Sequence, residues 1–433
     1  MNSFSNRLAY EPLHVQDAYA AHALGCMLRH ISEHSPFYKE LFAQHKVDIV
    51  TIKTLQDMQR LPFTTKRDMQ ARNWDFLCVP RDAVREYTAT SGTMGKPVTI
   101  ALTARDLDRL AYNESQSFRC ADGRPEDVYQ LALTLDRQFM AGIAYYSGIR
   151  SMDAALVRTG PGLPQMQWET IRRLDTSALV VVPSFLLVMA EWAKTHGIDL
   201  GKSTVAKAVC IGESLRRADF SLSALGEQIA AKWPLKLYNT YAATELQTAF
   251  TECSAGRGGH HQPDLIIIEI IDEEGQTVSD GMPGEVVITT LGIEGMPLLR
   301  YRTGDMAALH AEPCSCGRLS RRLGPVIGRK GQMIKYRGTT IYPPAIFDIL
   351  NEATYISEYI VEVFTGAQDT DELRLHLHTE LPVDECDRRL RVLLKSRLRV
   401  VPDLQYHAGA ELQAMLMPAG SRKQVRFIDK RTN

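Results

Sequence analysis

Residues 88–97 read Thr-Ala-Thr-Ser-Gly-Thr-Met-Gly-Lys-Pro and lead directly into a β-forming run. Hydroxyl side chains and glycines in quick succession offer hydroxyl donors and open backbone N–H groups, and both suit phosphate oxygens. Lys96 adds a positive charge to the segment. It is not a Walker A loop, because only two residues separate Gly92 from Gly95, and Pro97 stands where a Ser or Thr would hold Mg²⁺. A phosphate-binding loop and a plain Gly/Thr turn between strands are the two interpretations that this composition leaves open.

The segments on both sides of this stretch alternate between helical and β-forming patterns. Apolar residues recur at helical spacing over residues 13–45, which predicts a helix there. Elsewhere we predict helices at residues 106–118 and 167–174, and strands at residues 98–102, 128–133, 179–182 and 205–211. This alternation is typical of an α/β fold with buried parallel strands. From residue 265 onward, short β runs separated by turn residues predict a compact β subdomain.

Length, charge and cysteine usage exclude several classes of protein. The 433 residues predict about two or three domains. With 50 Lys+Arg against 51 Asp+Glu, the net charge of −1 gives no global field that would attract nucleic acid or an anionic membrane. The most apolar stretch, residues 177–192, is too short to span a bilayer, and residues 1–20 lack the apolar region of a secretory signal. Eight scattered cysteines are too few for a disulfide scaffold, so we expect a reducing, cytoplasmic environment and neither a nucleic-acid nor a membrane partner.

Five motifs in order resemble those of the adenylate-forming enzymes, the superfamily of acyl-CoA and aryl-CoA synthetases. They are TSGTMGKP (residues 90–97), IGE (211–213), YNTYAATE (238–245), RYRTGD (300–305), and Gly328-Arg329 with MIKYRGTTIYP (333–343). The phenylacetate–CoA ligase-like branch is indicated by MPLLRYRTGD (296–305), RGTTIYPPAI (337–346) and the tail QVRFIDKR (424–431). The resemblance implies the α/β adenylate-forming fold, with a large N-terminal α/β domain that includes a β subdomain (1–329) and a small, mobile α+β C-terminal domain (330–433).

The same resemblance implies an enzyme that activates a small carboxylic acid with ATP. The carboxylate attacks the α-phosphorus, pyrophosphate leaves, and a thiol then displaces AMP from the acyl-adenylate. The branch implies an aromatic (aryl or arylacetic) acid, coenzyme A as the thiol, and Mg²⁺ as the metal that accompanies ATP. Two alternatives stay open: transfer to an amine or a carrier-protein thiol, and a non-catalytic relative that only binds adenylate. A homodimer is an open alternative for the assembly.

The resemblance assigns residues to the nucleotide. The β- and γ-phosphates would be held by Thr90, Ser91, Gly92, Thr93, Gly95 and Lys96. The adenine side would be lined by Gly212, Glu213 and Tyr241, and Thr244 would also bind the nucleotide. Asp305 would accept hydrogen bonds from both ribose hydroxyls, and Arg329 would reach the ribose or a phosphate. Tyr241 as a core side chain and Asp305 as a turn cap after Gly304 are the structural alternatives.

Three charged residues are the catalytic candidates that the resemblance implies. Glu245 would be the Mg²⁺ carboxylate, in keeping with the hard oxygen ligands that this ion prefers, unless it is only a helix-start carboxylate. Lys96 would neutralise phosphate charge. Lys423 would be the mobile lysine that bridges the substrate carboxylate and the α-phosphate, since a long cationic side chain suits a role at both groups. The tail departs from the family pattern at Arg422, so Lys430 is the other candidate.

The acid site is expected in the segment LDRQFMAGIAYY, residues 135–146, which occupies the place of the aromatic-rich acid-site segment of the family. Its candidate substrate-binding residues are Phe139, Ala141, Gly142 and Tyr145, with Ala242 contributing a methyl group at the pocket floor. A stripe of this kind is also typical of an ordinary hydrophobic core, and this alternative stays open.

A second motif lies outside the nucleotide segments. Cys253 precedes a Gly-rich turn and the pair His260-His261, and Cys314-Ser-Cys316 follows further along the chain. Three thiolates and one imidazole form a closed tetrahedral structural Zn²⁺ site. We therefore predict zinc on Cys253, His260, Cys314 and Cys316, with His261 as the alternative imidazole. Three unpaired cysteines without metal are the competing interpretation.

Overall fold

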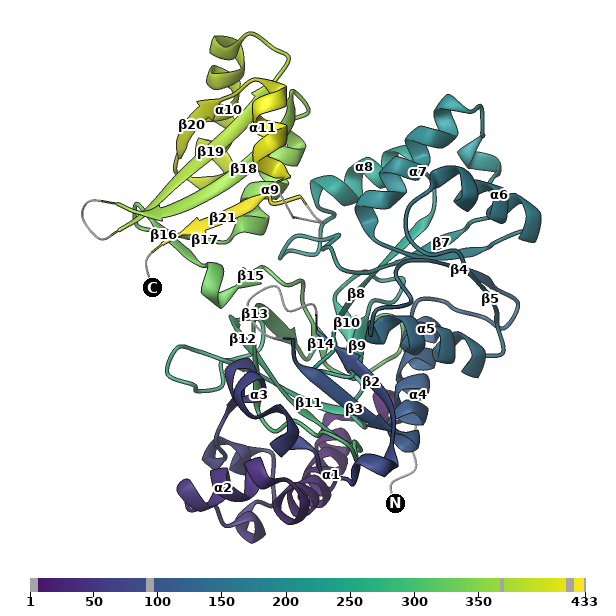
Figure 1. Ribbon diagram of the computed structural model, residues 1–433, viewed down its shortest axis with the longest axis vertical. Coiled ribbons are helices and arrows are strands. Elements are labelled where there is room, and N and C mark those ends of the chain that lie inside the picture. The colour runs from purple at the N-terminus through teal and green to yellow at the C-terminus, as the bar shows by residue number, and fades with distance from the viewer. Residues whose placement is uncertain (1–6, 91–96, 367–369, 418–423, 432–433) are drawn as a thin grey trace. The chain divides into compact units, whose positions relative to one another are not determined.

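The computed structural model describes residues 7–90, 97–366, 370–417 and 424–431 (Figure 1). The chain forms two compact units. Unit 1 comprises Met1–Leu222, Gly226–Thr303 and Ala307–Val326, and unit 2 comprises Ser223–Leu225, Gly304–Met306 and Ile327–Asn433. Within the described residues, no helix combines the length and the apolar character that crossing a membrane requires.

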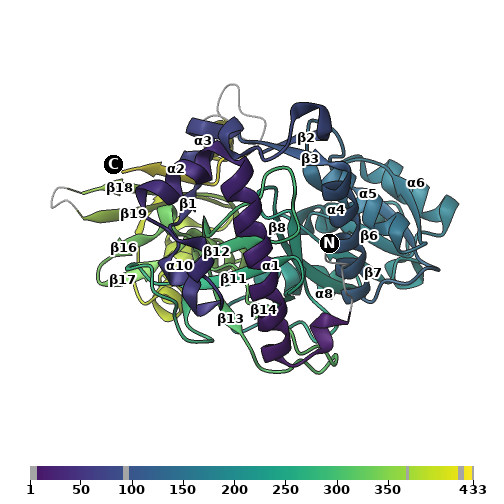
Figure 2. The same ribbon diagram turned by 90° about the horizontal axis from the view of Figure 1, so that it is seen from below.

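The N-terminal segment of unit 1 forms two helices where the sequence predicted one over residues 13–45. Helix α1 spans Leu13–His34 and α2 spans Pro36–Gln44. The prediction was wrong at the junction, because a proline in a helix interior has no N–H to donate and is tolerated only in the first turn. Ser35 caps the second helix, and its hydroxyl oxygen accepts a hydrogen bond from the Tyr38 N–H at 3.3 Å. The long helix α1 crosses the strands of this unit (Figure 2), and its buried face contributes Leu24, Leu28 and Ile31 to their core.

The strands of unit 1 follow one path of neighbours, β11-β12-β13-β14-β10-β9-β8-β7-β6-β4-β5, among the described residues. Their bounds are β4 (Val128–Ala132), β5 (Ala155–Arg158), β6 (Ala178–Val181), β7 (Lys207–Cys210), β8 (Lys236–Ala243), β9 (Thr248–Thr251), β10 (Gly259–His260), β11 (Ile266–Ile271), β12 (Pro283–Thr290), β13 (Tyr301–His310) and β14 (Arg322–Leu323). From β5 through β4, β6 and β7 to β8 the pairing is parallel. From β8 through β9 and β10 to β14 it is antiparallel. The parallel strands confirm the predicted α/β class, and the antiparallel, β-rich part continues the same path of strands.

Helices and short strands complete unit 1. They are β1 (Thr64–Thr65), α3 (Lys66–Arg72), β2 (Val84–Ala89), β3 (Thr99–Thr103), α4 (Ala104–Cys120), α5 (Met140–Ser151), α6 (Pro164–Leu174) and α7 (Pro183–Thr195), and α8 spans Ala224–Lys232. Helix α4 begins with a capping box, in which Thr103 and Asp106 satisfy each other's backbone N–H groups. Helices α4 and α5 lie side by side (Figures 1 and 2) and cover the core formed by the parallel strands.

Unit 2 is a small α+β body with its own core. A short hairpin of β16 (Ile334–Tyr336) and β17 (Thr339–Ile341) follows β15 (Gly328–Arg329). A separate sheet has the order β20-β19-β18-β21. The remaining elements are α9 (Pro343–Glu352), β18 (Ile356–Thr365), β19 (Asp371–Thr379), α10 (Val383–Leu398), β20 (Asp403–Tyr406), α11 (Gly409–Leu416) and β21 (Phe427–Lys430). Ile346, Val361 and Leu390 are fully buried and join α9, β18 and α10 in one core.

The close packing of α4 and α5 makes a testable prediction at Gly148. A Cβ at this position would lie 2.3 Å from the Glu114 Cβ and 2.9 Å from its backbone carbon, so Gly148→Ala should lower the free energy of unfolding by roughly 1–3 kcal/mol. Gly25 in α1 is the matched control, since the nearest atom to an added Cβ is the flexible Arg29 Nη1 at 3.9 Å. Gly25→Ala should raise the free energy of unfolding by about 0.5–1 kcal/mol through helix propensity. Urea unfolding measures both, and equal stability of the two variants would contradict the packing argument.

Candidate active site

The predicted phosphate loop and the predicted mobile lysine lie mostly outside the described residues. These residues are Ser91, Gly92, Thr93, Gly95, Lys96 and Lys423. The structure does describe the base of the loop. The Thr90 N–H donates to the Val98 carbonyl at 2.9 Å, and the Val98 N–H donates to the Thr90 hydroxyl at 3.0 Å. Thr90 therefore ties the two ends of the loop together at its base.

Glu245 lies just beyond the end of β8 and is only 7% exposed. Its Oε1 is 3.3 Å from the Lys66 Nζ and accepts a hydrogen bond of 3.4 Å from the Tyr301 hydroxyl. Lys66 begins α3 and Tyr301 begins β13, so three distant segments converge on this carboxylate. Thr244 beside it is half-buried. The sequence gives no signal for the role of Lys66 beyond the Thr65–Asp68 capping box, which indicates only the start of a helix.

The predicted adenine-side residues lie at or just after the carboxyl ends of β7 and β8, the edge at which α/β sheets bind ligands. The Glu213 carboxylate accepts hydrogen bonds from the Ser184 N–H at 2.8 Å and the Ser184 hydroxyl at 2.9 Å. It therefore sits at the N-terminal end of α7, where the helix dipole favours negative charge. Gly212 before it has φ of +78°, a backbone conformation that glycine adopts without strain.

Tyr241 and Ala242 point to opposite faces of β8, as neighbouring residues of a strand do. The Tyr241 ring is half-buried and lies near the Phe250 ring, with 6.1 Å between the ring centroids. Ala242 is exposed. Tyr241 is thus partly packed against the core, whereas Ala242 is open to solvent.

Asp305 and Arg329 meet within unit 2. They are directly opposite each other in the antiparallel pair β13–β15, and the Arg329 Nε is 3.2 Å from the Asp305 Oδ1. The carboxylate is 8% exposed, whereas the Arg329 side chain is 61% exposed. Lys430, the alternative to Lys423, lies on β21 and pairs its ammonium with the buried Glu362 carboxylate of β18. That ion pair gives Lys430 a structural partner of its own.

The predicted acid-site residues divide between surface and interior. Phe139, just before α5, is 39% exposed, and Ala141 is half-buried. Gly142 packs so tightly that an added Cβ would lie 2.6 Å from the Leu135 carbonyl oxygen. Tyr145 is 3% exposed, and its ring meets the Phe118 ring edge-on at 5.8 Å. Gly142 and the ring of Tyr145 are thus closely packed in the interior.

One interior carboxyl was missed entirely. Glu114 on α4 is 4% exposed, and its Oε1 accepts a hydrogen bond of 3.1 Å from the Asn113 amide. Burial raises the pKa of the Glu114 carboxyl to about 8, so the group is neutral at pH 7. A glutamate in the middle of a helix normally indicates a solvated face. The available signal was its position one turn after the buried Leu110 and one turn before Phe118, on the apolar stripe.

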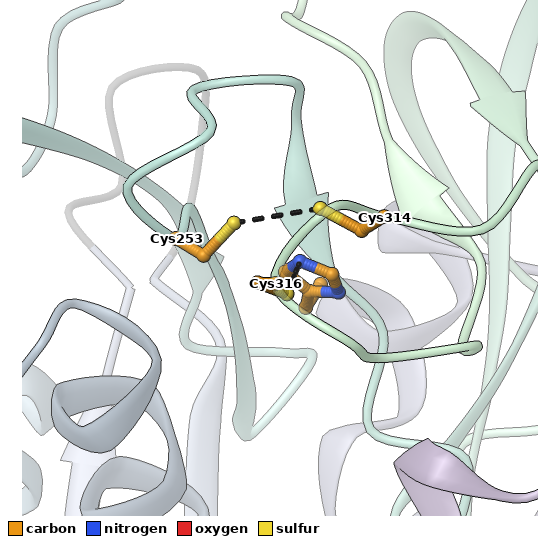
Figure 3. Close-up of side chains that lie close together, drawn as sticks. Cys253, Cys314 and Cys316 are labelled. Atoms are coloured by element: carbon orange, nitrogen blue, oxygen red, sulfur yellow. Dashed lines mark hydrogen bonds between the residues drawn. The ribbon is translucent and has the colours of Figure 1, made fainter.

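The predicted metal ligands come together in unit 1. Cys253 follows β9, His260 lies on β10, and Cys314 and Cys316 lie between β13 and β14. One ligand atom from each of the four lies within 4.8 Å of all the others. Figure 3 shows the three thiols turned toward a common centre, with 3.6 Å between the sulfurs of Cys253 and Cys314. The Cys316 sulfur is 3.4 Å from the His260 Nε2.

The spacing of these donors fits a tetrahedral ion. Zn–S bonds of about 2.3 Å and Zn–N bonds of 2.0–2.1 Å place neighbouring donors roughly 3.5–3.8 Å apart. The structure also decides between the two histidines. His261 turns away, its Nε2 hydrogen-bonds the Ile266 carbonyl, and its ring stacks near Phe250 with 6.3 Å between centroids. His260 is therefore the imidazole of the cluster.

Comparison with known proteins agrees with this architecture. The chain is 28% identical over 416 residues to a phenylacetate-coenzyme A ligase of Thermus thermophilus, with 91% of this chain and 90% of the relative covered. It is 25% identical over 405 residues to a phenylacetate-coenzyme A ligase of Escherichia coli, with 91% and 89% covered. A crystal structure of 2-hydroxyisobutyryl-CoA ligase in the postadenylation state with its acyl-AMP has a TM-score of 0.84 at 22% identity, covering 98% of this chain and 91% of that chain. These likenesses confirm the predicted adenylate-forming fold. The family model for AMP-binding enzymes matches residues 14–294, so the chain belongs to the AMP-binding enzyme family, in the phenylacetate–CoA ligase-like branch that its motifs predicted.

Proposed function

We propose that this protein is an acid–thiol ligase, which activates an aromatic carboxylic acid with ATP and transfers the acyl group to coenzyme A. The observation that carries the proposal is the relation to phenylacetate-coenzyme A ligases over about nine-tenths of both chains, 91% and 90% for the Thermus thermophilus protein. An aryl or arylacetic acid is the substrate class that these relatives favour. Transfer to an amine or to a carrier-protein thiol is the alternative for the second half-reaction.

Glu245 is the residue that we assign to Mg²⁺. Its carboxylate is nearly buried, yet one oxygen already attracts a cation, the Lys66 ammonium at 3.3 Å. A site that holds an ammonium group beside a carboxylate suits a hard metal ion, which prefers one or two carboxylates together with phosphate oxygens. When bound, Mg²⁺ would neutralise phosphate charge. The Tyr301 hydroxyl orients the carboxylate from the other side.

In unit 2, Asp305 and Arg329 are assigned to the ribose. The Asp305 carboxylate is held by the Arg329 guanidinium and is pre-positioned to accept hydrogen bonds from two neighbouring hydroxyls. The exposed Arg329 side chain leaves donors for a phosphate. We also propose that residues 330–433 act as the mobile domain and that Lys423 supplies the positive charge between the carboxylate and the α-phosphorus. Binding both groups in line would convert the encounter into an intramolecular attack.

The cluster of Cys253, His260, Cys314 and Cys316 is assigned to structural zinc. All four donors come from the protein, so no coordination position is left for a substrate. Cys253 lies in the connection from β9 to β10, His260 lies on β10, and Cys314 and Cys316 lie in the connection from β13 to β14. A bound ion would therefore hold these connections together, which is the role that zinc has in closed sites of this composition.

The ligase proposal is tested by carboxylate-dependent ATP–pyrophosphate exchange over benzoic, phenylacetic and fatty acids. We expect exchange with an aromatic acid, and thioester when coenzyme A is added. Glu245→Gln should lower the exchange rate at least about 100-fold, because it removes charge from the developing phosphoryl transition state. Glu274→Gln, the same change at an exposed position, should leave the rate unaltered. Exchange without thioester would favour another acceptor, and nucleotide binding without exchange on any acid would refute the ligase.

The zinc proposal is tested by metal analysis of two cysteine variants from the same neighbourhood. Wild-type protein should carry about one zinc per chain, and Cys316→Ser should carry almost none and unfold at a temperature several degrees lower. Cys120 is the matched control, because its thiol contacts the cluster region but donates to the Thr251 carbonyl at 3.2 Å. Cys120→Ser keeps that donor and should retain the metal. Equal zinc content in both variants would contradict the assignment.

A further inference from the structure

Glu114 is a buried carboxyl that neither the fold nor the proposed reaction explains. Asp106 and Arg109 of α4 have several hydrogen-bond partners in the fold, whereas Glu114 forms only the 3.1 Å hydrogen bond from its neighbour Asn113. Its second carboxyl oxygen forms no hydrogen bond among the described residues and is not one of their fully buried unpaired atoms, so it reaches open space. A nearly buried carboxyl with a single hydrogen bond is costly to desolvate, so this group needs an explanation.

Glu114 lies on the face of unit 1 that carries the candidate acid-site residues. Alternation along β8 places Tyr238 and Ala242 on one face, and Tyr238 belongs to the same buried cluster as Tyr145 of α5. Ala249, directly opposite Ala242 in the β8–β9 pair, donates its N–H to the Asn113 amide oxygen at 3.3 Å. Asn113, the neighbour of Glu114, is therefore hydrogen-bonded to β9, the strand that pairs with β8 beside the predicted pocket floor at Ala242.

Tyr145 is the second polar group in this interior. It stands one helical turn before Gly148, the glycine whose missing side chain lets α5 approach Glu114. Its hydroxyl has no hydrogen-bond partner among the described residues, and burial together with the nearby Glu114 raises the pKa of the phenol. Both groups are thus uncharged at neutral pH, and each offers an O–H donor and an acceptor lone pair.

We propose that Glu114, with Tyr145 beside it, is a specificity-determining residue that hydrogen-bonds a hydroxyl or amino substituent of the acid substrate. The inference rests on the proposed ligase function and narrows its substrate class to aromatic acids that carry a hydrogen-bonding group. Such a substituent satisfies the open carboxyl oxygen, whereas a methyl group of similar size would leave it unpaired. Sites built on this principle discriminate strongly against the analogue that lacks the polar atom.

The competing explanation is purely structural, with Glu114 as a tolerated polar residue between two helices. The two explanations differ in what an apolar replacement does. If Glu114 has only a structural role, its replacement changes the free energy of unfolding and leaves substrate preference unaltered. A recognition group changes the ratio of catalytic efficiencies between polar and apolar substrates, which stability does not affect.

The specificity test compares kcat/KM in ATP–pyrophosphate exchange for hydroxy- or amino-substituted phenylacetic and benzoic acids with kcat/KM for their methyl analogues. Wild-type protein should favour the polar member by about tenfold or more, and Glu114→Leu should bring this ratio to about one or below. Glu114→Met, of a different shape, gives the same test if the leucine variant does not fold. Glu114→Gln should restore most of the preference, because an amide still donates and accepts. Glu126→Gln, the same change at an exposed position, should keep the wild-type ratio.

The outcomes separate the two proposals. Exchange that proceeds with an unchanged ratio in Glu114→Leu and Glu114→Met would overturn the role of Glu114 and leave the ligase intact. A preference of the wild-type enzyme for the methyl analogues would also overturn the role of Glu114 and leave the ligase proposal intact. The absence of exchange with every acid in the wild-type protein would instead refute the ligase itself.

A pH titration of stability checks the buried, neutral state that the inference needs. The unfolded chain releases the Glu114 proton near its usual pKa of about 4.3, whereas burial raises the pKa in the folded protein to about 8. Between these values the folded state holds one proton more, so its contribution to the folding equilibrium constant should fall about tenfold per pH unit as the pH rises. Glu114→Gln should remove this slope. Urea unfolding at pH 5 to 8 measures it, and parallel curves for the two proteins would overturn the inference by showing a solvated carboxylate.

Discussion

The buried guanidinium of Arg109 is the interaction on which the arrangement of unit 1 depends. It is 1% exposed and donates to the carbonyls of Leu291, Gln247 and Leu265 at 2.6–2.7 Å and to the Thr248 hydroxyl at 3.0 Å. These acceptors lie at the ends of β12, β9 and β11, so one side chain fixes α4 against three strands. Burial lowers the pKa of Arg109 to about 10, which leaves the group charged at neutral pH. Removing it would leave several carbonyls without a donor in the interior, at a cost of about 1–3 kcal/mol each.

Because α4 is held so firmly, the groups along it acquire fixed positions. At its start, Asp106 accepts the Glu294 and Gly295 N–H groups at 2.8 and 2.9 Å and secures the loop that precedes β13. In its middle, Glu114 faces α5. At its end, Cys120 touches the region of the Cys/His cluster. The candidate acid site and the candidate zinc site thus share one rigid support, and groups on rigid elements keep a more precise geometry than groups on loops.

The sequence alone predicted the features of this protein that depend on short segments of the chain. Each helix, strand and family motif occupies a short run of residues, and its local pattern indicates what it forms. The metal-ligand candidates come from separate segments and were recognised by residue type, as a cysteine before a His pair and a Cys-Ser-Cys run. Contacts between distant segments were not predictable. The pairing of Lys66 with Glu245 joins positions with no common pattern, and the choice of His260 over His261 depends on which face of β10 meets Cys316. Pro36 is a local signal for the end of one helix and the start of the next. The helical spacing of apolar residues continues across it, so the sequence pattern predicted a single helix.

Arg109 and Glu114 show how the number of partners decides what a buried ionisable group does. Both lie on α4 and both are almost fully buried. The guanidinium has four acceptors and keeps its charge, whereas the carboxyl has one donor and gives its charge up. With four of its five N–H groups bonded within the fold, the guanidinium has a structural role. A neutral carboxyl with an open oxygen gains its missing hydrogen bond only from a molecule that enters the site, and this difference favours recognition over structure as the role of Glu114.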